Sequence, residues 1–295
     1  MPGLTAVGAS GKRERALSGR RVWVGLLLGI VGLSSVLHAA LFSMLIFLVA
    51  FASLYEFAKL SERKGPVFAY PVALVSITLY LGLTYMGLIH RFESVLLPAT
   101  VVGALVYATF TERGNYLARS SYTLLGVLYI GKLLSYFIEI RSIPTLGLPL
   151  TMYVIVLIAM TDVAAMLVGV RFGRTPLTRL SPKKTVEGAL GGFVVVTILG
   201  VAIGLLPQLH FAWWQGALIG AITSLAAQAG DIVESALKRD ARVKDTGNAI
   251  AGHGGVLDRF DSFIFGGIAF YFALWLVGFS VPGLHDLMKA AQAQM

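Results

Sequence analysis

The 295-residue sequence contains no cysteine and few charged residues. The missing cysteine excludes disulfide bonds, thiolate zinc sites and cysteine nucleophiles. Charged residues make up only 13% of the chain and hydrophobic residues 57%, whereas a soluble domain usually carries about 25% charged residues. Apolar runs of roughly twenty residues recur along the chain, which predicts an all-α polytopic integral membrane protein. These runs are continuous rather than alternating, which argues against a closed β-barrel.

Nine apolar segments are candidate transmembrane helices. They are residues 22–37, 39–59, 67–89, 94–111, 120–140, 147–170, 187–206, 212–236 and 259–280. Only His38 separates the first two, so a re-entrant hairpin is the alternative there. A signal peptide is the alternative for the charged start, but no clear small-x-small cleavage site follows it. We expect a basic tail over 1–21, one transmembrane domain over 22–280 and a short tail over 281–295.

The net charge of +9 is distributed unevenly over the predicted loops. With the N-terminus in the cytoplasm, the cytoplasmic loops carry most of the 24 lysines and arginines, whereas the outer segments carry only Arg91, Arg141 and Lys289. Cytoplasmic loops of membrane proteins collect basic residues, so this orientation is predicted. Anionic lipids and anionic substrates, and not nucleic acid, are the expected partners.

Several charged residues fall inside the predicted spans. Such residues cost about 2.5–3.5 kcal/mol each on insertion and tend to mark function. Glu56 and Glu234 lie near cytoplasmic ends, where we expect them to reach water. Lys132 is placed to pair with an acid. Asp162 and Asp231 have no such simple explanation and are candidates for a functional site.

A stretch of mixed charge and glycine, residues 235–261, separates the last two predicted spans. The span before it carries polar residues at the spacing i, i+3, i+4 and i+7, which places them on one helical face. These residues are Asp231, Glu234, Ser235 and Lys238. The sequence therefore predicts a polar stripe that leads into the charged stretch.

Asp258 and Asp261 are spaced i, i+3 at the start of the last span, so their carboxylates can point the same way. Carboxylates that converge either share protons or hold a hard cation such as Mg²⁺. Helix capping by Asp258 is the alternative, and it is compatible with metal binding.

Two further features suit phosphate. Glycines within residues 247–255 let the backbone approach a ligand and present N–H groups to its oxygens, although a flexible loop has the same composition. In the loop 171–186, Lys183 and Lys184 follow Ser181-Pro182, a common helix start. Lysines at a helix start suit phosphate, and basic loop charge without a ligand is the alternative.

The order of residues in these stretches follows a known pattern. The run contains Ser235, Lys238, Arg239, Lys244, Asp245, His253, Gly254, Gly255, Asp258, Arg259 and Asp261. It resembles the signature of the CDP-diacylglycerol synthases, also called phosphatidate cytidylyltransferases, of bacterial type. Ala251 departs from the pattern, since the family usually has proline or glycine there. The segment from Ser181 to Gly188 and the aspartates Asp162 and Asp231 are also similar to the family, so the resemblance covers about the C-terminal half.

The resemblance implies a membrane enzyme that converts CTP and phosphatidate into CDP-diacylglycerol and pyrophosphate with Mg²⁺, and with room for a second cation. It implies a site at the cytoplasmic face of the cell inner membrane, and homodimerisation is a family-level expectation. The implied metal ligands are Asp231, Asp258 and Asp261. The implied catalytic residues are Lys238, Arg239, Lys244, Asp245, His253 and Arg259. The implied substrate-binding residues are Asp162, Ser181, Lys183, Lys184, Thr185, Ser235, Gly254 and Gly255.

The chemistry of this reaction fits the composition of the stretch. A phosphate monoester has a second pKa of about 6 and is largely a dianion at neutral pH, so the attacking group needs no general base. We therefore expect His253 to bind or orient phosphate or nucleotide instead of abstracting a proton.

Two alternatives stay open. A related membrane CTP-dependent transferase or kinase acting on another lipid would share this architecture. An ion-coupled transporter would use Asp162, Lys132 and Asp231 as a relay and would spread polar residues across the bilayer. The charged residues gather instead on one predicted side, which favours the enzyme.

Overall fold

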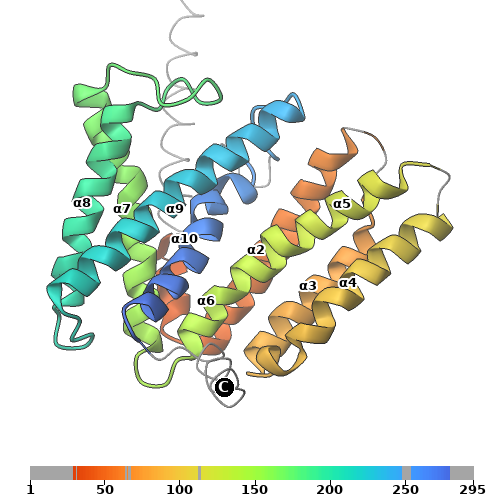
Figure 1. Ribbon diagram of the computed structural model, residues 1–295, viewed down its shortest axis with the longest axis horizontal. Coiled ribbons are helices and arrows are strands. Elements are labelled where there is room, and N and C mark those ends of the chain that lie inside the picture. Colours follow the sequence, from red (N-terminus) through yellow and green to blue (C-terminus); the bar gives the residue numbers. More distant parts are fainter. Residues whose placement is uncertain are drawn as a thin grey trace, which may run out of the picture.

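The computed structural model describes residues 29–30, 32–63, 65, 68–111, 114–247 and 254–279. Within these ranges the regular structure is helical and contains no strand, so the all-α prediction is confirmed (Figure 1). The helices are α2 (Ala39–Glu62), α3 (Tyr70–Tyr85), α4 (Ile89–Thr111), α5 (Tyr116–Gly126), α6 (Leu133–Ser142), α7 (Gly147–Phe172), α8 (Val186–Gly204), α9 (Trp213–Asp240) and α10 (Leu257–Leu276). A π-helical segment, η1 (Val127–Lys132), joins α5 and α6 into one continuous helix.

The described ranges hold seven helices that are long and apolar enough to cross a membrane, counting α5, η1 and α6 as one. The apolar helix α3 has 16 residues and is shorter than these. Half of the predicted first span, together with the tails 1–21 and 281–295, lies outside the described residues. The structure thus supports a multi-pass membrane protein, whereas the count of nine spans stays a prediction.

Several helices extend beyond the predicted span boundaries, and in α4 and α9 the added or terminal turns carry paired charged residues. Helix α4 begins at Ile89, five residues before the predicted start, and its Glu93 carboxylate lies 2.8 Å from the Lys132 ammonium. The expected ion pair of Lys132 is thereby confirmed. Helix α9 continues to Asp240, and Glu234 and Lys238 pair one turn apart near its end. Pairing of this kind lets a helix continue through residues that hydropathy assigns to a loop.

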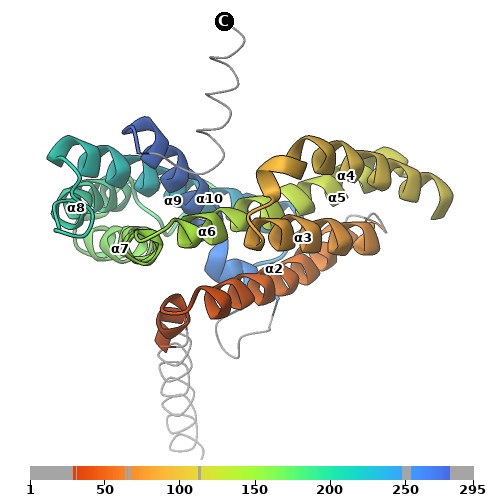
Figure 2. The ribbon, with the colours of Figure 1, turned by 90° about the horizontal axis from the view of Figure 1, so that it is seen from below.

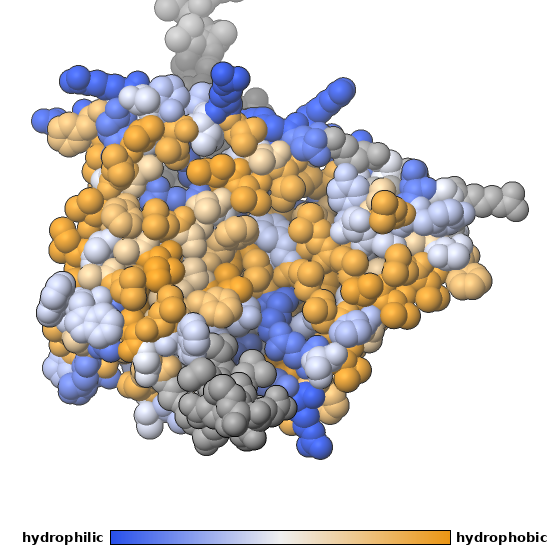
Figure 3. Space-filling model, in the orientation of Figure 1, coloured by the Kyte–Doolittle hydropathy of each residue, from blue (hydrophilic) through white to orange (hydrophobic). Residues whose placement is uncertain are grey.

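The helices are arranged in two groups, which Figures 1 and 2 show from two directions. Helices α2 to α5 form one group, α7 to α10 form the other, and α6 packs between them against α2, α7 and α10. With α5, η1 and α6 counted as one, successive helices run in alternating directions, so the C-terminal ends of α2, α4, α7 and α9 lie at the same end of the molecule (Figure 1). Hydrophobic side chains cover the middle of the face shown in Figure 3, and hydrophilic ones gather along this end.

Close contact between α8 and α9 depends on glycine. Gly216 and Gly220 of α9 lie one helical turn apart and face the backbone of α8. A Cβ atom at Gly220 would lie 2.7 Å from the carbonyl oxygen of Val196. Small residues at such spacing let two helix backbones approach within a membrane, where packing drives association. This contact fixes α9, which carries the polar stripe, against α8.

We expect Gly220→Val to lower the thermal stability of the detergent-solubilised protein, because the added side chain forces α8 and α9 apart. Overpacking of this kind typically costs about 1–3 kcal/mol. The measurement is the midpoint of thermal unfolding, with Gly82→Val as control, since a Cβ at Gly82 meets nothing within 4 Å. Equal midpoints for the two variants would contradict the role of Gly220 in packing.

Candidate active site

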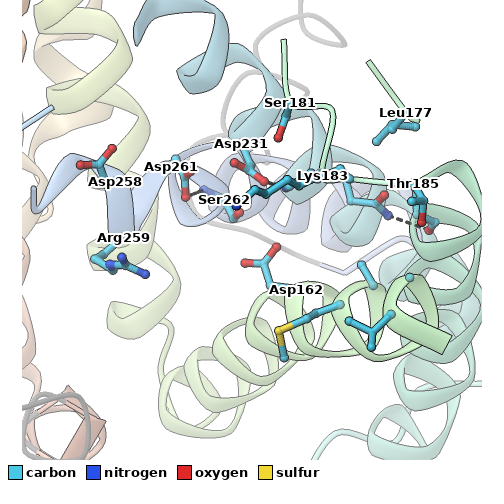
Figure 4. A pocket seen from close by; sticks show the side chains of 17 residues that line it. Asp162, Leu177, Ser181, Lys183, Thr185, Asp231, Asp258, Arg259, Asp261 and Ser262 are labelled. Atoms are coloured by element: carbon cyan, nitrogen blue, oxygen red, sulfur yellow. Dashed lines mark hydrogen bonds and ion pairs between the residues drawn. The ribbon is translucent and has the colours of Figure 1, made fainter. Parts of the chain in front are cut away.

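A cavity of about 580 Å³ lies among α7, α8, α9, α10 and the connection 173–185 (Figure 4). Helix α7 contributes Asp162 and an apolar wall that includes Met166 and Val170. The connection contributes Ser181, Lys183, Lys184 and Thr185. Helices α9 and α10 contribute Gln228, Asp231, Asp258, Arg259, Asp261 and Ser262. The two stretches that the sequence singled out therefore face each other across one cavity.

Three carboxylates from α9 and α10 lie close together, and two of them, Asp231 and Asp261, line the cavity. Oxygen atoms of Asp231, Glu234 and Asp261 lie within 4.8 Å of one another. Asp261 is 8% exposed and Glu234 is fully buried. Buried like charges at such separation require either protons or a cation. In Figure 4, Asp231 and Asp261 lie on one side of the cavity, and the carboxylate of Asp162 points towards them from α7 on the other side.

Lysine side chains pair with these acids. Lys184 of the connection forms an ion pair with Asp231. Lys238, one turn beyond Glu234 on α9, pairs with Glu234 and lies 2.7 Å from the Oδ1 atom of Asp258. The predicted stripe is thus present on one face of α9, and it joins the acids of α9 to the start of α10.

Asp258 lies in the first turn of α10 and binds the backbone of the preceding segment. Its Oδ2 atom accepts hydrogen bonds from the backbone N–H groups of Gly255 at 2.7 Å and Thr246 at 2.9 Å. Asp258 is the second residue of α10, and both of its backbone donors precede that helix, so it holds the preceding segment against the first turn and does not cap α10. Asp258 lies outside the group of three close carboxylates, and its metal role stays a prediction.

The connection 173–185 is held against α8 by two local contacts. Thr185 caps α8 by accepting a hydrogen bond from the Gly188 N–H at 3.1 Å. The carboxylate of Glu187 accepts hydrogen bonds from the backbone N–H groups of Arg174 at 3.1 Å and Thr175 at 3.2 Å. These bonds fix the backbone that carries Lys184. Burial lowers the pKa of Lys184, while nearby carboxylates, including Asp162, act in the opposite direction.

The remaining predicted site residues do not line the cavity or lie outside the described residues. Arg239 is exposed and donates to the Val243 carbonyl at 3.2 Å, and Lys244 and Asp245 are exposed beyond α9. Ser235 is partly buried on α9 and does not line the cavity. Gly254 has a φ of +83°, a left-handed conformation that favours glycine. His253 and Ala251 lie outside the described residues.

Two acids differ from their sequence interpretation. Glu56 and Glu234 were expected to reach water at helix ends, and this is wrong, because Glu56 is 4% exposed and Glu234 is fully buried. The sequence did hold a signal that Glu234 belongs to the carboxylate group, because it follows Asp231 by three residues on the polar stripe. The transporter relay also fails to assemble among the described residues, since Lys132 pairs with Glu93 and does not line the cavity.

Comparison with known proteins shows which enzyme family the chain belongs to. The model of the cytidylyltransferase family matches residues 19–277, which is most of the chain. The chain belongs to the cytidylyltransferase family. It is therefore an enzyme of the nucleotidyltransferase class, and the resemblance seen in the C-terminal half extends through the N-terminal helices.

Curated relatives of this cytidylyltransferase are similar over most of their length. The chain is 36% identical over 270 residues to the phosphatidate cytidylyltransferase of Bacillus subtilis, covering 87% of this chain and 97% of that protein. It is 34% identical to the one from Synechocystis, covering 83% and 91%. It is 33% identical to the one from Helicobacter pylori, covering 68% and 74%.

The residues present fit a divalent cation. Carboxylate oxygens are the ligands that Mg²⁺ prefers, and the ion is usually bound by few carboxylates together with substrate phosphates. Asp231, Glu234 and Asp261 offer three such groups at ligand spacing. Because the cavity also holds Lys183, Lys184 and Arg259, phosphate groups beside the cation would meet counter-charges.

Proposed function

We propose that the protein transfers the cytidylyl group of CTP to phosphatidate, giving CDP-diacylglycerol and pyrophosphate for phospholipid synthesis. A phosphate oxygen of phosphatidate forms a new bond to the α-phosphorus of CTP, and the bond between the α- and β-phosphates breaks as pyrophosphate leaves. The observation that carries this proposal is the cavity itself, in which acids of α9 and α10 face bases of the connection 173–185.

The side chains are suited to positioning and charge neutralisation, which dominate phosphoryl-type transfer. Lys183, Lys184 and Arg259 are placed to contact the phosphates of the two substrates. Mg²⁺ would be held by Asp231 and Asp261, with Glu234 beside them and Asp258 as a further candidate, and would neutralise charge on the triphosphate. In this arrangement the Lys184–Asp231 pair opens or shifts when the anionic substrate and the cation enter.

The remaining assignments follow the signature. Lys238 orders Glu234 and Asp258, and Asp162 supports the polar cavity from α7. From the signature we assign Arg239, Lys244, Asp245 and His253 to catalysis. We assign Gly254, Gly255, Ser181, Thr185 and Ser235 to substrate binding, and of these Ser181 and Thr185 line the cavity.

The proposed location is the cell inner membrane, with the cavity facing the cytoplasm. Two observations support it. The connection 173–185 and the described residues that follow α9, both of which carry lysines and arginines, lie at one end of the molecule, and the cavity is formed at that end (Figure 1). Soluble CTP would then enter from the cytosol, while phosphatidate would arrive from the bilayer past the apolar wall that includes Met166 and Val170.

The test is turnover by the purified protein in detergent–lipid micelles. CTP, phosphatidate and Mg²⁺ together should give equimolar CDP-diacylglycerol and pyrophosphate. Chelation with EDTA should reduce the rate to background, and excess Mg²⁺ should restore it. Parallel reactions with diacylglycerol and polyprenol test a lipid kinase activity. Absence of product from phosphatidate, with the protein folded, would contradict the proposed function.

A further inference from the structure

Glu56 connects the N-terminal helices to the start of α10. It lies near the end of α2, and its side chain is buried. Its Oε1 atom accepts a hydrogen bond from the Val256 N–H at 2.9 Å, and its Oε2 atom accepts one from the Leu257 N–H at 2.8 Å. The first N–H groups of a helix lack partners within the helix. A carboxylate there forms strong charge-assisted hydrogen bonds and interacts favourably with the helix dipole.

The same carboxylate holds the segment that follows α9. The Thr246 hydroxyl lies 3.1 Å from Oε2 of Glu56 and 3.0 Å from Oδ2 of Asp258, so it bridges the two acids. The backbone N–H groups of Thr246 and Gly255 both donate to Asp258. The two ends of the glycine-rich segment between Thr246 and Gly255 are therefore held together by two carboxylates, one of which comes from α2.

Close packing around Glu56 leaves little freedom at this point. A Cβ atom at Gly247 would lie 2.7 Å from the Oε1 atom of Glu56. Glycine at this position therefore lets the Glu56 carboxylate approach the backbone. From Glu56, contacts run through Thr246 to Asp258 and on to Lys238 and Glu234. A displacement of Glu56 would thus be transmitted to the acids and the base beside the cavity.

We propose that Glu56 is a positioning residue for cytidylyl transfer. It fixes Thr246 and the start of α10, and it thereby places the Asp258–Lys238 pair. Glu56 itself does not line the cavity. The inference rests on the proposed function, because it concerns the rate of that reaction. It assigns a specific task to the N-terminal group of helices, whose described residues do not line the cavity.

The first test is Glu56→Gln. Each carboxylate oxygen accepts from a backbone N–H, so either orientation of the glutamine amide places an NH₂ group against a donor. Misplacement of reacting groups by about 1 Å costs on the order of 100-fold. We expect kcat to fall about 10- to 100-fold, with the KM values for CTP and phosphatidate changed little, because the substrate contacts lie elsewhere in the cavity.

Two variants of α2 serve as controls. Glu62→Gln removes an exposed carboxylate from the same helix and should leave kcat unchanged. Leu54→Ala removes a fully buried side chain and should lower the unfolding midpoint while leaving kcat of the folded enzyme unchanged. A loss of kcat in Glu56→Gln that exceeds the loss in Leu54→Ala, at equal or smaller loss of stability, separates positioning from structural damage.

Thr246→Val is a second variant that tests the same inference, and it can be used even if Glu56→Gln folds poorly. It removes the bridging hydroxyl, and we expect kcat to fall with KM little changed. Where Glu56→Gln folds, the double variant should lose less kcat than the product of the single losses, because the two residues share one hydrogen bond. Wild-type kcat in Glu56→Gln or, if that variant does not fold, in Thr246→Val would overturn the inference while leaving the proposed function intact. Absence of turnover in the wild-type protein would overturn both.

Discussion

Asp261→Asn is expected to lower turnover about 10³-fold while the protein keeps its fold, a loss of about 4 kcal/mol of transition-state stabilisation. Asp261 is buried beside Asp231 and Glu234, and these three acids are the described carboxylates at ligand spacing. Asparagine retains the shape and one oxygen but removes the negative charge that a divalent cation requires. The remaining activity should need a higher Mg²⁺ concentration for half-maximal rate, measured as pyrophosphate release over a Mg²⁺ titration.

The control for Asp261→Asn is Asp240→Asn, which changes an exposed carboxylate at the end of α9 and should leave the rate unchanged. Asp258→Asn, titrated in parallel, separates a metal ligand from a carboxylate that only holds Lys238 and the start of α10. A matching shift in Mg²⁺ requirement would assign Asp258 to the metal. Near-normal activity of Asp261→Asn at ordinary Mg²⁺ would contradict the proposed metal site.

Lys238→Met is expected to abolish measurable turnover and also to destabilise the fold. Lys238 lies between Glu234, which is fully buried, and Asp258, whose side chain is 6% exposed. Removing one partner of a buried ion pair leaves an uncompensated charge and costs about 3–5 kcal/mol. The midpoint of thermal unfolding and the rate of pyrophosphate release should therefore both fall.

A second substitution distinguishes the two effects of losing Lys238. The double variant Lys238→Met with Glu234→Gln removes the unpaired acid as well, so its stability should recover partly while its turnover should not. Arg171→Met, an exposed change at the end of α7, controls for loss of a positive charge. If Lys238→Met matched this control in both stability and rate, the Lys238 contacts would contribute nothing to fold or function.

The fold class and much of the site could be predicted from local sequence. Continuous apolar runs cannot satisfy their backbone groups in lipid except as helices, so hydropathy alone gave most of the described helices. The stripe of Asp231, Glu234 and Lys238 follows from helical spacing, which is a property of the backbone. Boundaries were less predictable, because the ends of α4 and α9 depend on ion pairs such as Glu93–Lys132.

By itself, the sequence determined that this is a helical membrane protein with acids and bases suited to phosphate and a cation. Only the tertiary structure decided how those groups combine. It placed Glu234 in the carboxylate group beside Asp231 and Asp261 and joined Asp258 to the backbone of Thr246. It brought Glu56 to the backbone of Leu257, 201 residues away in the chain. Spacing along one helix is fixed by its backbone, whereas contacts between distant segments depend on packing that no local pattern encodes.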